Sequence, residues 1–187
     1  MITYDDALAM LERHEVHPDI IRHSEGVAEI ALDLATRIAE ERPELGVNAE
    51  KVRLAALLHD LGRCRSSAHE WHTGAILRNA GLGRIAEITM HGAAYERVLL
   101  LEGVADESLL PHSVENKIVA YADLRFCQVP MSVEERLQDA IERKSASPLA
   151  VRIIRAAEPR FRELEAEVLG LLESEEAEDG ERAVGAS

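Results

Sequence analysis

The central helix of this protein is predicted by one apolar stretch, Val52-Arg53-Leu54-Ala55-Ala56-Leu57-Leu58-His59-Asp60-Leu61-Gly62. Its apolar residues build a wide surface, which is typical of a helix that is buried against several neighbours. Asn48 is a favourable N-cap residue before this stretch, and Gly62 is a favourable residue for ending a helix. The stretch ends with an adjacent histidine and aspartate, which are unusual residues in so apolar a segment.

Helical periodicity continues on both sides of this stretch, and the sequence carries almost no strand signals. Before it, a long helix is predicted from Pro18 to about residue 39, and a shorter helix is predicted over residues 4–14. After it, further helices are predicted over residues 70–80, 84–91, 113–127, 132–144 and 148–172. The sequence therefore predicts an all-α fold, arranged as a compact helical bundle.

The chain has 187 residues, which is enough for one domain with a full hydrophobic core. A chain of this length buries roughly 70% of its unfolded surface, so the fold needs neither disulfides nor a structural metal. We predict one domain over residues 1–172. Residues 173–187 hold six acids, one arginine and few apolar side chains, and they are predicted to form a disordered acidic tail.

The net charge of −14, from 21 basic and 35 acidic residues, argues against binding of nucleic acid polymers or anionic membranes. A local cluster of basic residues can still attract a small anionic ligand. No run of 18 apolar residues is present, so we expect a soluble cytoplasmic protein. The apolar run at residues 98–101 is expected to be a core segment, with a pocket wall or a contact in a homo-oligomer as the alternatives.

The two cysteines, Cys64 and Cys127, are too few for a disulfide framework, and their spacing does not form a thiolate zinc site. Free cysteine is among the most frequently buried residue types. We therefore expect both cysteines to be small buried side chains.

Four polar side chains lie where an apolar residue is expected. His23 lies on the apolar stripe of the long helix, as either a hydrogen-bonded core residue or a ligand. His59 and Asp60 are either a buried hydrogen-bonded pair or two ligands that converge near a helix end. Asp123 faces the core side of its helix, where a carboxylate needs an arginine or a cation as its partner.

Taken together, these four residues place two imidazoles and two carboxylates on the apolar faces of three separate helices. Each residue alone has an ordinary structural explanation, but the four together favour a metal site. Imidazole and carboxylate ligands suit a divalent ion such as Mn, Fe, Ni, Co or Zn.

The order of His23, His59-Asp60 and Asp123 resembles the H…HD…D signature of the HD-domain metal-dependent phosphohydrolases. The flanking segments are also similar to the family's, namely His23-Ser24, Leu57-Leu58-His59-Asp60-Leu61-Gly62-Arg63 and Lys117-Ile118-Val119-Ala120-Tyr121-Ala122-Asp123. The resemblance covers about residues 18–127. It implies a helical HD-domain bundle and a hydrolase that acts on phosphate esters.

The resemblance also implies the roles of individual residues. His23, His59, Asp60 and Asp123 would bind one divalent metal, which would activate a water for attack on phosphorus, and Asp60 would also orient that water. Subfamilies with two metals have further histidines between the HD pair and the last aspartate. His69 and His91 match those places, so they are expected to bind a second ion or to line the site.

Arg63 is the basic residue that we expect to bind the substrate phosphate, because it directly follows the predicted end of the ligand helix. With Asp60, it is a predicted catalytic residue. The expected reaction is hydrolysis of a phosphomonoester or phosphodiester in a nucleotide or another small phosphorylated metabolite. The alternatives are a metal-containing HD module that senses a nucleotide without hydrolysing it, and a helical interaction protein with ordinary buried polar residues.

Overall fold

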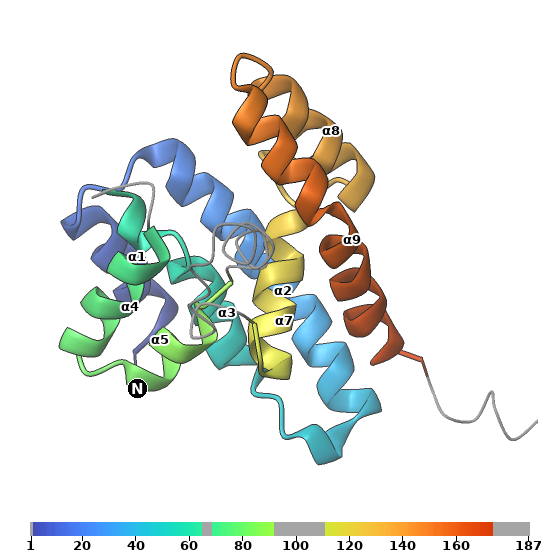
Figure 1. Ribbon diagram of the computed structural model, residues 1–187. Helices are drawn as coiled ribbons and strands as arrows, with labels where there is room; N and C mark the ends of the chain where they lie inside the picture. The colour runs from blue at the N-terminus through green and yellow to red at the C-terminus, as the bar shows by residue number, and fades with distance from the viewer. Residues whose placement is uncertain (1, 65–68, 92–110, 174–187) are drawn as a thin grey trace, which may run out of the picture.

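The computed structural model describes residues 2–64, 69–91 and 111–173, and these residues form a helical protein (Figure 1). The α-helices in these ranges are α1 (Tyr4–Arg13), α2 (Pro18–Glu41), α3 (Ala49–Leu58), α4 (His69–Asn79), α5 (Gly83–Ile88), α7 (Val114–Leu124), α8 (Val133–Arg143) and α9 (Pro148–Gly170). The described residues hold no β-strand, although Phe126 and Pro130 form an isolated bridge. The predicted all-α fold is confirmed.

Side-chain caps begin several helices where the sequence predicts them. Asn48 accepts a hydrogen bond from the backbone of α3, and Ser147 does the same for α9. Thr3 and Ser132 form complete capping boxes at the starts of α1 and α8. Because these caps satisfy backbone N–H groups that have no partner inside the helix, they determine where each helix starts.

The central helix α3 ends earlier than the sequence predicts. It stops at Leu58, and the chain continues through His59 and Asp60 into the short 3-10 helix η2 (Leu61–Cys64). The histidine and the aspartate therefore lie in the tight turn between two helical segments. This turn allows both side chains to face the same side, which adjacent residues within a helix cannot do.

The helix predicted over residues 113–127 also ends early, at Leu124. Arg125 follows it, and its Nε donates a hydrogen bond to the carbonyl oxygen of Met131 over 2.6 Å. This bond closes the loop between α7 and α8. The arginine thus stabilises a turn, and Asp123 lies in the last turn of α7.

The core lies where α2, α3 and α7 pack against one another, at the centre of Figure 1. Its fully buried side chains include Val27 from α2, Leu57 from α3, and Ile118 and Tyr121 from α7. In the figure α1, α4 and α5 lie on one side of these three helices, whereas α8 and α9 lie on the other. The helices that carry or precede His23, His59-Asp60 and Asp123 therefore pack against one another near the middle of the molecule.

Two predictions concern residues that the structure does not describe. The acidic tail lies beyond residue 173, and the apolar run at residues 98–101 lies in the gap before Pro111. The domain extent of residues 1–172 stays a prediction. Among the described residues, no helix combines the length and the apolar character that a membrane crossing needs.

Candidate metal centre

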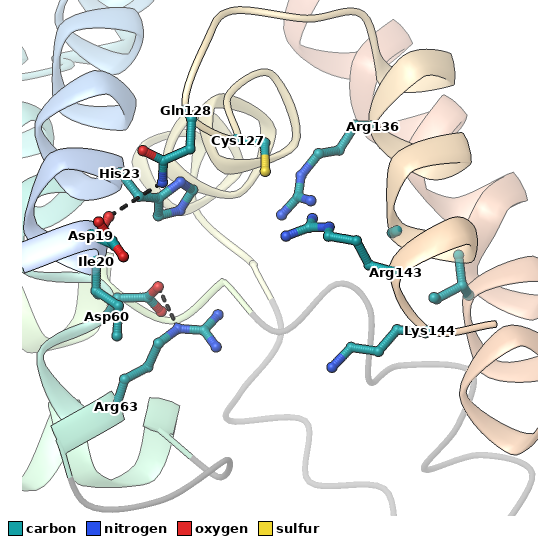
Figure 2. Close-up of a pocket in the computed structure, with 12 residues that line it drawn as sticks. Asp19, Ile20, His23, Asp60, Arg63, Cys127, Gln128, Arg136, Arg143 and Lys144 are labelled. Carbon is teal, nitrogen blue, oxygen red and sulfur yellow. Dashed lines mark hydrogen bonds and ion pairs between the residues drawn. The ribbon is translucent and has the colours of Figure 1, made fainter. Parts of the chain in front are cut away.

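The predicted ligands come from five different segments. Two of them line a pocket of about 430 Å³, which Figure 2 shows. His23 lies on α2, His59-Asp60 follow α3, and Asp123 lies in the last turn of α7. His69 is the first residue of α4, and His91 lies just after α5. His23 and Asp60 line the pocket itself, so the pocket reaches the edge of the otherwise buried cluster.

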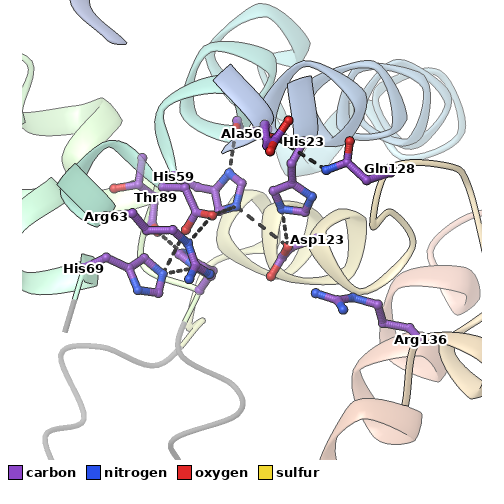
Figure 3. Close-up of polar contacts among 12 residues, drawn as sticks. His23, Ala56, His59, Arg63, His69, Thr89, Asp123, Gln128 and Arg136 are labelled. Carbon is purple, nitrogen blue, oxygen red and sulfur yellow. Dashed lines mark hydrogen bonds and ion pairs between the residues drawn. The ribbon is translucent and has the colours of Figure 1, made fainter. Parts of the chain in front are cut away.

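Each residue of the H…HD…D series lies near another residue of the series, and Figure 3 shows His23, His59 and Asp123 beside one another. His23 Nε2 is 2.9 Å from Asp123 Oδ1. His59 Nε2 is 3.5 Å from Asp60 Oδ2 and 3.7 Å from Asp123 Oδ1. One nitrogen of His59 therefore faces both carboxylates.

His69 and His91 join the same cluster. His69 Nε2 lies 2.9 Å from Asp60 Oδ1 and 3.3 Å from His91 Nε2. The donor atoms of Asp60, His69 and His91 lie within 4.8 Å of one another, and so do those of His59, His91 and Asp123. The structure thus brings all six predicted metal-site residues together, and His91 lies close enough to share either group.

Backbone carbonyls orient two of the imidazole rings toward the cluster. His59 Nδ1 lies 2.6 Å from the carbonyl oxygen of Ala56, and His91 Nδ1 lies 2.7 Å from that of Thr89. A carbonyl only accepts, so each Nδ1 carries a proton, and in a neutral ring Nε2 then keeps its lone pair. His59 Nε2 is buried and has no hydrogen-bond partner among the described residues. This tautomer, with an unsatisfied Nε2, is the one that a metal ligand requires.

The charges of the cluster also suit a cation. Burial lowers the pKa of His59 to about 4, so its ring is neutral at neutral pH. Burial alone would raise the pKa of Asp123, but its hydrogen bond with His23 and the nearby imidazoles outweigh burial and lower it. The pKa of Asp60 is likewise lowered, because His59, His69 and Arg63 outweigh the effect of burial. The neutral imidazole of His59 and the two ionised carboxylates are in the protonation states that bind metals. The pKa of His69 is raised, because its hydrogen bond with Asp60 and the charges of Asp60 and Glu70 outweigh burial, so a metal would have to displace a proton from this ring.

Thr73 on α4 holds the turn that carries His59 and Asp60, and the sequence did not indicate this role. Its hydroxyl accepts a hydrogen bond from the N–H of Gly62 over 2.8 Å and donates one to the carbonyl of His59 over 3.1 Å. The side chain is fully buried. One threonine therefore satisfies both ends of the ligand turn.

Replacing Thr73 with valine should lower the free energy of unfolding by about 1–3 kcal/mol, because the buried N–H of Gly62 would lose its acceptor. Metal affinity should fall by about 10–100-fold, which is the usual effect of losing a residue that orients ligands. Chemical denaturation and metal titration measure the two effects. Thr36→Val, at an exposed position on α2, is the control; equal values for both variants would contradict this role.

Asn116 on α7 positions the segment that carries His91. Its side-chain amide donates to the carbonyl oxygens of Glu87, Ile88 and Met90 at 2.6, 2.9 and 3.2 Å. Asn116 also belongs to the capping box of α7 with Ser113. The sequence shows only the second role, since the first depends on a segment more than 25 residues away.

Two other sequence predictions are modified by the structure. Arg63 lines the pocket, but its guanidinium also pairs with Asp60, so it neutralises a ligand carboxylate.

Cys64 is exposed, and Cys127 is only partly buried beside the pocket. The prediction that both cysteines are buried was wrong, because Cys64 ends a short 3-10 helix at the surface rather than continuing the buried α3.

These features define a class of protein, an all-helical domain with a histidine and aspartate centre suited to a divalent metal. The family model of the HD domain matches residues 20–125, and the chain belongs to the HD domain family. That range contains every residue of the cluster.

Two relatives are similar to this chain. An uncharacterized protein of Methanocaldococcus jannaschii is 35% identical over 126 residues, which cover 64% of this chain and 73% of that protein. A tRNA (cytidine(56)-2'-O)-methyltransferase of Picrophilus torridus is 30% identical over 156 residues, which cover 80% of this chain but only 43% of the methyltransferase. No solved structure matches the chain significantly.

Proposed function

We propose that this protein is a metal-dependent phosphohydrolase that acts on a nucleotide or another small phosphorylated metabolite. The family in general consists of metal-dependent phosphohydrolases. The observation that carries the proposal is the buried, unpaired Nε2 of His59, which faces the carboxylates of Asp60 and Asp123 beside an open pocket.

The residues present fit a divalent ion of the Mn, Fe, Ni, Co or Zn group. In the proposal His23, His59, Asp60 and Asp123 hold one ion, and His69 and His91 complete the site or hold a second ion with Asp60. A bound ion supplies an activated water and neutralises charge on a phosphate oxygen. The protein supplies the rest: carbonyls of Ala56 and Thr89 fix the imidazole rings, and Asp60 orients the attacking water.

Arg63 has a second task in the proposal. Its side chain is 42% exposed and pairs with Asp60, so it lies between the ligand cluster and the pocket. A guanidinium offers several donors in a planar fork, and it can contact a phosphate oxygen while it remains near the carboxylate. Arg63 therefore binds the substrate phosphate next to the metal centre. The proposal places this activity in the cytoplasm and on small molecules. The net charge of −14 is in keeping with small molecules as substrates, because it disfavours nucleic acid polymers.

The proposal is tested with protein that is purified without an affinity tag. We expect stoichiometric metal at neutral pH, stabilisation by Mn or Co, and hydrolysis of at least one member of a substrate panel. The panel holds nucleotides, cyclic dinucleotides, dinucleoside polyphosphates and generic phosphoesters, each assayed with several metals. Absence of metal binding would overturn the metal centre. Tight nucleotide binding without turnover would instead support a nucleotide sensor.

A further inference from the structure

The wall of the pocket that faces the metal centre is basic. Arg136 and Arg143 on α8, and Lys144 directly after it, all line the pocket. Figure 2 shows their charged ends pointing across the pocket toward the side where His23 and Asp60 lie. Arg136 and Arg143 are seven residues apart, which is two helical turns, so they share one face of α8. We call these three residues the α8 basic wall.

The α8 basic wall carries more positive charge than its surroundings neutralise. Asp139 lies between the two arginines, with its Oδ2 atom 3.3 Å from Arg136 Nη1 and 2.5 Å from Arg143 Nη2. One carboxylate thus serves two guanidinium groups. Lys144 is exposed, and it forms no ion pair with the acidic residues that the structure describes. In a protein of net charge −14, such a local excess attracts small anions to one place.

One N–H group of Arg136 has no hydrogen-bond partner in the fold that the structure describes. Its Nε is buried, and it has no hydrogen-bond acceptor among the described residues. Buried donors usually have a partner, and an arginine with a purely structural role would be expected to have one for each buried N–H. The fold thus leaves one N–H of Arg136 unsatisfied, in a residue that lines the pocket.

The metal centre and Arg63 already provide for one phosphate in the proposed function. The α8 basic wall is a second set of cations on the opposite side of the same pocket, and a pocket of about 430 Å³ is large enough for a small metabolite. A substrate with a single phosphate would leave the excess positive charge of these residues, beyond what Asp139 neutralises, without an anion. Cations gathered around one pocket bind phosphate groups through charge-assisted hydrogen bonds.

We propose that the α8 basic wall binds a second phosphate group of the substrate while the first phosphate lies at the metal centre. The substrate class is thus a small metabolite with at least two phosphate groups. This inference rests on the proposed function, because the metal centre defines the first phosphate position. The two groups are either adjacent, as in a diphosphate, or at two ends of one molecule.

The test compares ligands that differ by one phosphate. Calorimetry with the full-length, metal-loaded protein measures binding of AMP against ADP, and of fructose 6-phosphate against fructose 1,6-bisphosphate. We expect the second phosphate to strengthen binding about tenfold in at least one pair. The pair that shows the gain tells whether the two phosphates are adjacent or separated. Equal affinities within both pairs would overturn the inference.

The double variant Arg143→Gln/Lys144→Gln should remove that gain and leave binding of the monophosphate within about twofold. The matched control is Arg152→Gln/Arg155→Gln, which removes the same charge from exposed positions on α9 that do not line the pocket. If the double variant fails to fold, Lys144→Gln alone tests the same point at an exposed residue. A gain that survives in folded variants would contradict the assignment to α8.

Calorimetry also separates this inference from the proposed function. For every ligand that the protein does not hydrolyse, calorimetry reports binding alone, so a protein that hydrolyses nothing can still show the second phosphate site. Conversely, hydrolysis of monophosphates with no preference for a second phosphate would leave the proposed function in place and remove the α8 basic wall from it.

Discussion

Asp60→Asn is expected to abolish the proposed phosphohydrolase activity and to lower metal affinity by well over 100-fold. Asparagine keeps the shape of the side chain but removes its charge. Asp60 contacts His59 Nε2 at 3.5 Å and His69 Nε2 at 2.9 Å, so it links the two halves of the cluster. Loss of a residue that merely orients a ligand costs 10–100-fold, and loss of a direct ligand should cost more.

Metal analysis of the purified variant and turnover with the best substrate of the panel measure this effect. Asp33→Asn is the matched control, because Asp33 is an exposed aspartate on α2 that pairs with Arg37. The control should keep both metal and activity. Turnover that survives in Asp60→Asn at the level of the control would refute the assigned site.

Gly62→Ala is expected to lower the free energy of unfolding by about 2–3 kcal/mol, which is at the upper end for adding one methyl group to a packed site. A Cβ at this position would lie 2.7 Å from the backbone nitrogen of Thr73 and closer still to the carbonyl oxygen of His69. Both atoms belong to the backbone of α4, so they cannot move without displacing the start of that helix. Because His69 lies there, metal affinity should fall as well.

Gly83→Ala is the control for this prediction. A Cβ at Gly83 meets no atom within 4 Å, and its backbone angle is one that other residues adopt. Alanine there should be neutral or stabilise the protein by about 0.4–1 kcal/mol, since it reduces the freedom of the unfolded chain. Thermal unfolding and metal titration of both variants are the measurements. Similar melting temperatures for the two would show that α4 does not pack closely on Gly62.

Much of the helical structure could be predicted from the sequence, because helix signals are local. The caps at Asn48, Ser132 and Ser147 are visible in the sequence, since a cap depends on residues three positions apart. The early end of α3 was not predicted. It depends on Thr73, whose hydrogen bonds to the turn join residues 11 and 14 positions apart.

The candidate metal-site residues could be predicted from the sequence because they break a local pattern. A histidine or aspartate on an apolar helix face is costly unless it has a partner, and His23 and Asp123 were recognised for that reason. Arg136 and Arg143 break no pattern. Charged residues on an amphipathic helix are ordinary, and only the packing of α8 beside the pocket gives them a common direction.

The sequence by itself thus determines the helices, the family and the residues with metal-binding chemistry, since each depends on short-range spacing or on residue type. The tertiary structure determines which atoms face one another. His23 and Asp123 are 100 residues apart and meet at 2.9 Å, and the α8 basic wall faces a centre that lies on other helices. Such contacts arise from the packing of whole helices, and no local pattern in the chain records them.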